Sequence, residues 1–228
     1  MLKQDLIAKN PIRHLKSEGG TQDAGRMGLV MARAGVGKTA LLVQIALDSL
    51  LNDKEVVHVS VGQTIEKAKL WYEDMFKDIA ESCNLSNATE VHDEIMRHRM
   101  IITFNESKFS RAKLQERLSD LIQQNVIRPS CMVVDGFDFA KTDRSVLEEV
   151  KAMARAMGLQ VWFSSLCEDD GESCHAMDDL FDTVVVLQPA PEKSCLDLKV
   201  VKGATAMSKC GKLLKLDPIT FMVKESCE

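Results

Sequence analysis

The sequence predicts an α/β protein with a mainly parallel central sheet, helices that flank this sheet, and antiparallel strands at its C-terminal end. Two patterns lead to this prediction. From Arg26 onward, short apolar runs alternate with segments of helical periodicity, which is typical of parallel strands joined by helices. After Thr183 the chain consists of short extended stretches with little room for helices, so we expect these stretches to pair as antiparallel strands.

The predicted elements follow one another along most of the chain. Strands are expected at short apolar runs bounded by polar or turn residues: 28–31, 56–61, 100–104, 131–134, 160–164 and 183–187. Helices are expected at 40–51, at 65–79, around 114–122 and from about 145 to 157. The late extended stretches are 195–201, 212–216 and 221–223.

Chain length and composition favour one domain. With 228 residues, of which 45% are hydrophobic and 28% charged, the chain can bury one sizeable core. Residues 1–25 are mixed polar, contain Pro11 and the Gly19-Gly20 pair, and are interpreted as a leading segment that ends in a turn. We therefore expect a single domain over residues 1–228.

The location of the protein is predicted from what the chain lacks. No apolar run reaches the roughly 18 to 20 residues needed to span a bilayer, and the N-terminus lacks the basic-then-apolar layout of a signal peptide. We therefore expect a cytoplasmic protein that does not contact a membrane. Seven irregularly spaced cysteines then predict reduced thiols rather than a disulfide framework. Cys167, Cys174 and His175 could bind a metal, but structural zinc sites usually use paired cysteines, so zinc is not expected.

The charge balance makes nucleic acid an unlikely partner. Nucleic-acid binding depends on Lys and Arg side chains that neutralise phosphates, and this chain has 29 of them against 34 Asp and Glu, for a net charge of −5. The acidic run Glu168-Asp169-Asp170, followed by Glu172, would repel phosphates. A solvated loop without such a role is the other interpretation of this run.

A phosphate-binding P-loop (Walker A) is predicted between the first strand and the first long helix. The motif G-x-x-x-x-G-K-[ST] is matched from its second position onward, in the strand–loop–helix context that it requires. Two glycines let backbone N–H groups face the phosphates, Lys38 can reach the β and γ phosphates, and Thr39 can coordinate Mg²⁺. The predicted nucleotide-binding residues are Ala32, Arg33, Ala34, Gly35, Val36, Gly37, Lys38, Thr39 and Ala40.

The first position of the motif departs from the pattern, because Ala32 stands where glycine is usual. Alanine needs a negative φ at that position or some backbone strain. Since alanine is the smallest substitute, we interpret it as a tolerated variant. The alternative is that these residues form only a turn and a helix cap.

A second carboxylate-bearing strand is expected to complete the site. Met132-Val133-Val134-Asp135 is an apolar strand that ends in a carboxylate, and such strand ends lie at the ligand crevice of an open α/β sheet. Asp135 is therefore predicted to hold Mg²⁺, directly or through water. A plain turn at Asp135 and Gly136, or the neighbouring Asp138 in the same role, are the competing interpretations.

Taken together, the loop at 32–39, the strand that ends in Asp135, the strand at 160–165 and the β-rich tail resemble the RecA-like P-loop ATPases, especially the branch of circadian-clock ATPases, archaeal recombinases and replicative helicases. The likeness extends in element order from about 10 to 221 and is most specific at the phosphate loop. It implies a RecA-like P-loop NTPase fold that binds ATP and Mg²⁺. Family members sense the γ-phosphate with a polar residue at the end of the fourth strand, and Ser164 occupies that place, next to Ser165.

The resemblance fails at the group that polarises the attacking water. The family has a glutamate just after the second core strand, whereas this sequence has Gly62-Gln63-Thr64 there. Gln63 can orient a water but is a far weaker base than a carboxylate. Glu66, one helical turn further on, is the other candidate, although capping of the helix that begins near Thr64 is the simpler interpretation of this residue.

Two further features of the family are only partly matched. A late hairpin of family members carries a lysine and an arginine that reach the γ-phosphate of the neighbouring subunit, and here only Lys202 stands at that place. Trp71, Tyr72 and Phe76 could stack on bases, but their helical spacing among apolar residues favours a core stripe.

These observations predict an ATP- and Mg²⁺-binding protein with slow or absent hydrolysis that acts as a nucleotide-dependent switch or scaffold. Lys38, Gln63, Glu66 and Asp135 are its candidate catalytic residues. Two alternatives from other classes stay open: a competent ring-forming ATPase motor that acts on nucleic acid or protein, and a P-loop kinase for a small molecule. A homo-oligomer and a protein partner are both compatible with the sequence, and ATP is favoured over GTP by the family likeness alone.

Overall fold

A central mixed sheet organises the computed structural model of the chain, which describes residues 1–15, 24–106, 109–167, 177–190, 195–203 and 214–224. In these residues the sheet has nine strands in the order β3-β2-β4-β5-β1-β6-β7-β8-β9. The strands from β3 to β6 in this order pair in parallel, and β7, β8 and β9 continue the sheet antiparallel. The predicted α/β class, with a mainly parallel sheet and antiparallel C-terminal strands, is confirmed.

The observed strands match the predicted apolar runs to within a few residues. The parallel strands are β1 (Met27–Ala32), β2 (Val56–Val61), β3 (Arg99–Phe104), β4 (Cys131–Asp135), β5 (Gln160–Leu166) and β6 (Thr183–Pro189). The antiparallel strands are β7 (Leu196–Lys202), β8 (Leu214–Leu216) and β9 (Val223–Lys224). β1, β2 and β4 are buried along their whole length, and β5 is buried except at its last residue. These strands therefore appear in the sequence as continuous apolar runs rather than as alternating ones.

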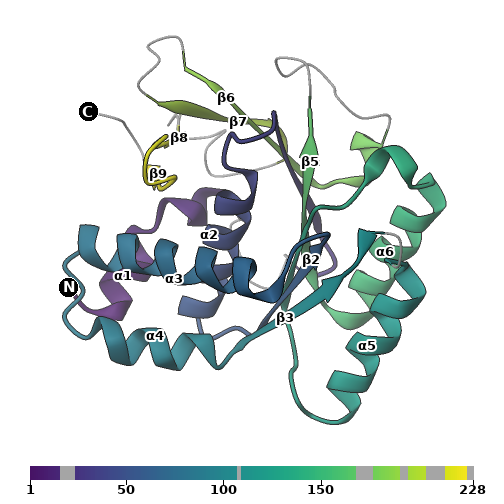
Figure 1. Ribbon diagram of the computed structural model, residues 1–228, viewed down its shortest axis with the longest axis horizontal. Helices are drawn as coiled ribbons and strands as arrows, with labels where there is room; N and C mark the ends of the chain where they lie inside the picture. The colour runs from purple at the N-terminus through teal and green to yellow at the C-terminus, as the bar shows by residue number, and fades with distance from the viewer. Residues whose placement is uncertain (16–23, 107–108, 168–176, 191–194, 204–213, 225–228) are drawn as a thin grey trace.

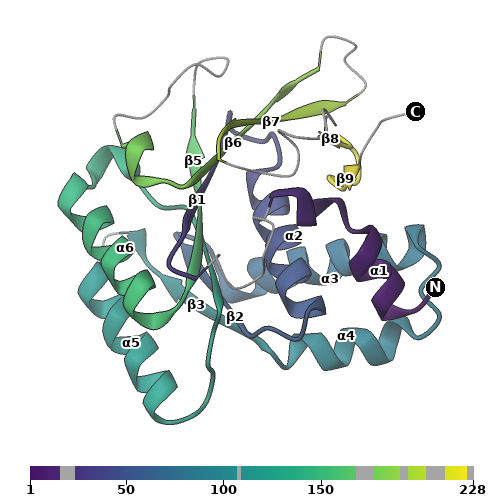
Figure 2. The same cartoon turned by 180° about the vertical axis from the view of Figure 1, so that it is seen from behind.

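Helices cover both faces of the sheet, as Figures 1 and 2 show. One face carries α1 (Lys3–Lys9), α2 (Lys38–Leu51), α3 (Ile65–Ser82) and α4 (Ala88–Met96). The other face carries α5 (Arg111–Gln123) and α6 (Arg144–Met157). Short 3-10 helices lie at η1 (Pro11–Leu15), η3 (Phe139–Lys141) and η4 (Asp178–Leu180).

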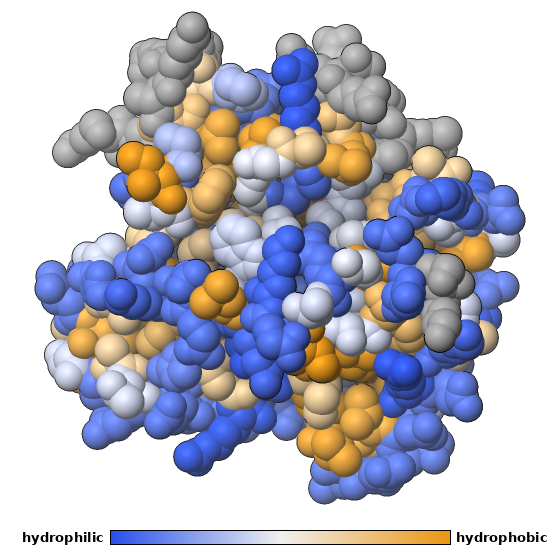
Figure 3. Space-filling model, in the orientation of Figure 1, coloured by the Kyte–Doolittle hydropathy of each residue, from blue (hydrophilic) through white to orange (hydrophobic). Residues whose placement is uncertain are grey.

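Each face of the sheet has its own apolar cluster, because successive strand residues point to opposite sides. In β1, Val30 and Ala32 face the α2 side, whereas Leu29 and Met31 face the α5 and α6 side. Helix α2 is buried from Ala40 to Leu51 and is the central element of its layer. Hydrophilic residues cover much of the outer surface of α3 and α4, with hydrophobic residues in separate patches (Figure 3). Among the described helices, none is long and apolar enough to cross a membrane.

The leading segment is more structured than its composition suggests. Leu6 of α1 and Ile12 and Leu15 of η1 are buried in the same apolar cluster as α2. The side-chain amide of Asn10 donates to the buried carboxylate of Asp48 at 2.7 Å, which fixes the segment to α2. The sequence analysis assigned no helix to residues 3–15, where the structure has α1 and η1. These elements are too short for a helical pattern to stand out in the sequence.

The thiol prediction also needs correction. Cys167 and Cys195 are disulfide-bonded, so the expectation of reduced thiols is wrong for these two residues, while Cys83 and Cys131 form no disulfide. Irregular spacing along the chain does not show which sulfur atoms the fold brings together. Cys174 and His175 lie outside the described residues. Among those described, no cluster of three or more metal-ligating side chains occurs.

A buried glutamine attaches the C-terminal strands to α2. The side-chain amide of Gln44 donates to the carbonyl oxygen of Phe221 at 2.7 Å, and its oxygen accepts from the backbone N–H of Val223 at 2.9 Å. Gln44 is only 4% exposed, so both backbone groups depend on it for a partner. The amide thereby links the end of the sheet to the helix that follows the β1–α2 loop.

Replacement of Gln44 by leucine should destabilise the protein by about 1 to 3 kcal/mol, because it removes the side-chain partner of the buried Val223 N–H and of the part-buried Phe221 carbonyl. The Val223 amide should also exchange its hydrogen faster, which nuclear magnetic resonance can measure together with urea unfolding. Gln123→Leu, at an exposed position of α5, serves as the control and should change stability by less than about 0.5 kcal/mol. Equal stability of the two variants would show that Gln44 does not hold the C-terminal strands.

Candidate functional site

The loop between β1 and α2 is open toward solvent. Residues 33–35 are exposed, and a Cβ atom built on Gly35 would meet no atom within 4 Å. Ala32 is the last residue of β1, pairs with Leu166, and does not have a positive φ. The alanine at this position therefore introduces no backbone strain, as expected for a tolerated variant.

Gly37 sets the junction between this loop and α2. It caps the helix with a φ of +97°, which glycine adopts readily and residues with a side chain do not. A Cβ atom here would lie 2.8 Å from the Phe221 ring and 2.9 Å from Leu216, so the C-terminal strands pack directly against the loop. The first backbone N–H groups of α2 follow this turn and have no partner within the helix.

Lys38 folds back over the loop. Its ammonium group donates to the carbonyl oxygens of Ala32 at 3.0 Å and Arg33 at 2.9 Å. Burial lowers the pKa of Lys38, and the nearby Asp135 carboxylate opposes this shift. A cation, a helix N-terminus and open glycine backbone together form an environment suited to an anion.

Asp135 is the centre of the candidate site. Its carboxylate is 4% exposed and accepts hydrogen bonds from the Thr39 hydroxyl at 2.7 Å and the Ser164 hydroxyl at 2.6 Å. The Ser164 oxygen in turn accepts from the backbone N–H of Gly136 at 3.3 Å. The structure thus brings together Lys38, Thr39, Asp135 and Ser164, which the sequence predicted separately.

Strand register explains this convergence. Asp135 pairs with Ser60 of β2, and one residue earlier Val134 pairs with Phe163 of β5, so Ser164 lies beside Asp135. The side chains of Asp135 and Ser164 point to the α2 face. Thr39, the second residue of α2, contacts Asp135 there. The carboxyl ends of parallel strands meet at one edge of the sheet, which is where ligands bind in open α/β sheets.

The oxygen atoms of Thr39 and Asp135 fit a magnesium ion. Mg²⁺ prefers hard oxygen ligands and usually takes one or two from protein, with the rest from water and phosphate. A hydroxyl and a carboxylate 2.7 Å apart, next to the helix N-terminus, match that requirement. The neighbouring Asp138 has another role, because it caps η3 and pairs with Lys141 at 2.7 Å.

The two proposed water-handling residues lie after β2. Gln63 is half-buried in the bend between β2 and α3. Glu66 is fully exposed in the first turn of α3, where Thr64 caps the helix by accepting from the N–H of Lys67 at 3.3 Å. Hydrogen bonds from its own backbone N–H and from the Thr64 side chain lower the pKa of Glu66. This geometry favours the capping interpretation of Glu66.

The remaining candidates lie away from the Asp135 cluster or outside the described residues. The ammonium of Lys202 donates to the carbonyl oxygens of Asp178 at 2.9 Å and Asp179 at 3.3 Å. Lys202 is therefore held by η4 of its own chain. The acidic run from Glu168 to Glu172 lies outside the described residues.

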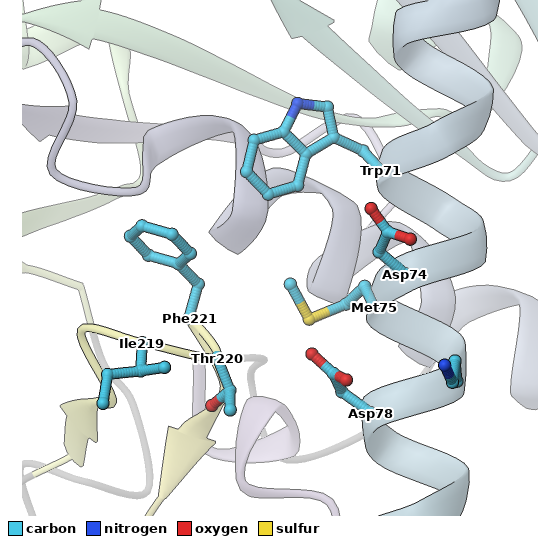
Figure 4. Close-up of a pocket in the computed structure, with 8 residues that line it drawn as sticks. Trp71, Asp74, Met75, Asp78, Ile219, Thr220 and Phe221 are labelled. Atoms are coloured by element: carbon cyan, nitrogen blue, oxygen red, sulfur yellow. The ribbon is translucent and has the colours of Figure 1, made fainter.

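The aromatic residues of α3 divide into two groups. Tyr72 and Phe76 are buried, as the core interpretation predicted. Trp71 is half-buried and faces Phe221 across a cavity of about 310 Å³, with their rings 6.2 Å apart (Figure 4). The cavity is also lined by Asp74, Met75, Lys77, Asp78, Ile219 and Thr220.

The sequence did not predict a group of contacting polar side chains near the site. His58 Nδ1 lies 3.1 Å from the hydroxyl of Tyr72, and the Arg99 guanidinium stacks over the Tyr72 ring at 4.5 Å. Burial lowers the pKa of His58 to about 4, with Asp135 opposing the shift and Arg99 adding to it. His58 is therefore neutral at neutral pH. A lone histidine in an apolar strand gives no sequence signal for such an arrangement.

Comparison with known proteins does not add to this description. No protein-family model matches the chain, and no curated protein matches it either.

Titration of His58 should make the fold acid-sensitive. Its folded-state pKa of about 4 lies below the usual value of 6.5, so the unfolded chain binds more protons between these pH values. The free energy of unfolding should therefore fall as pH falls from about 6.5 to about 4, by up to about 3 kcal/mol. Urea unfolding at several pH values measures this slope. In His58→Gln the slope should be shallower than in the wild type.

His98→Gln is the matched control for this experiment, since His98 is an exposed histidine. The pH dependence of its unfolding is the reference against which the change in His58→Gln is judged. Identical slopes for the wild type and His58→Gln would contradict the assigned role of His58.

Proposed function

We propose that this chain is a RecA-like ATP- and Mg²⁺-binding protein with slow or absent hydrolysis that acts as a nucleotide-dependent switch or scaffold. The observation that carries the proposal is the buried Asp135 carboxylate, which receives hydrogen bonds from Thr39 and Ser164 beside Lys38. A structural turn would not need hydroxyl groups from α2 and β5 around one carboxylate.

The β1–α2 loop supplies what nucleotide phosphates need. Exposed backbone at 33–35 and the free N–H groups of α2 offer several donors, and the helix dipole favours a negative charge. Lys38 already uses its ammonium group to bind carbonyl oxygens of the loop. In the proposed complex it exchanges these neutral acceptors for the β and γ phosphates, which are charged and bind it more strongly.

Two residues would hold the metal, and a third, Ser164, would respond to the nucleotide state. Thr39 and Asp135 would share Mg²⁺, which supplies charge neutralisation on the phosphates when bound. Ser164 forms hydrogen bonds with both Asp135 and the N–H of Gly136. A γ-phosphate that changed the hydrogen bonds of Ser164 would therefore shift the end of β4. This coupling supports a switch as the functional class.

Slow hydrolysis is proposed because known accelerating groups are not in their usual places. Gly62-Gln63 follows β2, next to the strand of Asp135, where the resembled family has glutamate. Lys202 is bound to the carbonyl oxygens of Asp178 and Asp179, which draws it toward its own η4 rather than toward another subunit.

Lys38→Ala should abolish detectable MgATP binding, with affinity at least about 100-fold lower, because charged hydrogen bonds contribute about 1.5 to 3 kcal/mol each. The fold should persist, since Lys38 is not a core residue. Calorimetric titration measures the affinity, and circular dichroism checks the fold. Lys113→Ala, at an exposed position of α5, should bind MgATP like the wild type. Micromolar affinity in a folded Lys38→Ala protein would remove the phosphate site from the proposal.

A further inference from the structure

A carboxylate that follows the neighbouring strand β3 lies beside Gly62, the residue that follows β2. Glu106 follows β3, and a Cβ atom built on Gly62 would lie 2.6 Å from its Oε1, 2.9 Å from its Cγ and 3.2 Å from its Cδ. The side chain of Glu106 therefore occupies the space into which any side chain at position 62 would extend. Gly62 also has a φ of +75°, which favours glycine at this turn.

The parallel register of β2 and β3 fixes this contact. Val61 pairs with Phe104, and the backbone N–H of Gly62 donates to the Phe104 carbonyl oxygen at 2.9 Å. Both strands thus end at the same level, and the chain beyond β3 turns back over the end of β2. This pairing ends two residues before Glu106 and places the start of its segment beside Gly62.

Gly62 in turn adjoins the Asp135 strand. β2 pairs with β4 up to Ser60 and Asp135. Beyond that pair, the backbone of Gly136 packs so closely on the Val61 carbonyl that a Cβ atom at Gly136 would collide with it. A continuous set of close approaches therefore leads from the Glu106 side chain through the backbone of Gly62 and Val61 to the strand end that carries Asp135.

We propose that Glu106 is the base that activates water for ATP hydrolysis at this site, in place of a side chain at position 62. This inference rests on the proposed function. A carboxylate oxygen of Glu106 accepts a proton as the water oxygen bonds to the γ-phosphorus. The bond from that phosphorus to the β–γ bridging oxygen breaks, and its electron pair leaves with ADP. Glu106 then releases the proton to solvent, and ADP and inorganic phosphate are the products.

Glu106 suits this role better than the two residues after Gly62. The amide of Gln63 can orient water but is not basic enough to take its proton. The carboxylate of Glu66 is fully exposed and is engaged by hydrogen bonds at the start of α3. Glu106 has the required chemistry and lies at the carboxyl edge of the sheet, with β2 between its own strand and the strand of Asp135.

The surroundings of Glu106 also account for slow turnover. Glu106 is exposed to solvent, which screens its charge and does not hold a single water in place. The pKa of the Lys141 ammonium group is raised mainly by its hydrogen bond with Asp138, and the charge of Glu106 adds to this shift. Lys141 therefore lies within electrostatic reach of the carboxylate that would act on the water.

The test separates binding from chemistry in the full chain. MgATP affinity is measured by calorimetric titration, and hydrolysis is measured in single turnover with excess protein. Glu106→Gln should bind MgATP with wild-type affinity but hydrolyse it at least about 100-fold more slowly, the lower end of the contribution of a general base. Glu116→Gln, an exposed carboxylate of α5, is the matched control and should hydrolyse ATP at the wild-type rate.

Each other outcome identifies what is wrong. Equal hydrolysis by Glu106→Gln and the wild type, or a wild type that binds MgATP without hydrolysing it, would overturn the role of Glu106 and leave the nucleotide site intact. A large loss in Gln63→Ala with none in Glu106→Gln would assign water activation to Gln63 instead. A wild type that does not bind MgATP would overturn the proposed function and this inference together.

Discussion

A buried carboxylate paired with two hydroxyl groups lies where α2 meets the central strands. A desolvated charge such as that of Asp135 is stable only if nearby groups replace the water it has lost. Thr39 from α2 and Ser164 from β5 donate to it, and Lys38 lies nearby with its positive charge. These residues come from distant parts of the chain, so the carboxylate also fixes how the central elements dock on one another.

The sheet and its C-terminal extension keep α2 in the position this pairing needs. Parallel order brings the ends of β2, β4 and β5 to one edge, and the register aligns Asp135 with Ser60. On its far side, α2 is fixed by Asp48 to the N-terminal segment and by Gln44 to the last strands. The antiparallel tail thus supports the β1–α2 loop in addition to extending the sheet, as the packing of Phe221 on Gly37 shows.

Local patterns predicted much of this arrangement. The buried strands are continuous apolar runs with turn residues at their ends. The same patterns singled out Lys38, Thr39, Asp135 and Ser164, which lie close together at one edge of the sheet. Features that depend on distant contacts were not predictable. The disulfide at Cys167 requires a sulfur atom brought near by the fold, and α1 and α4 are too short for a clear periodic pattern. Likewise, the contact of Glu106 with Gly62 depends on the register of β3 against β2, which periodicity does not encode.

If Asp135 and Thr39 hold a magnesium-bound nucleotide, as we propose, the affinity of the chain for ATP depends on magnesium. Calorimetric titration of the wild type with ATP, in magnesium buffer and again after chelation by EDTA, compares the two affinities in one protein. We expect tighter binding with Mg²⁺, because Thr39 and Asp135 would hold the ion beside the phosphates. Binding that is equally strong without magnesium, or undetectable in both buffers, would contradict it.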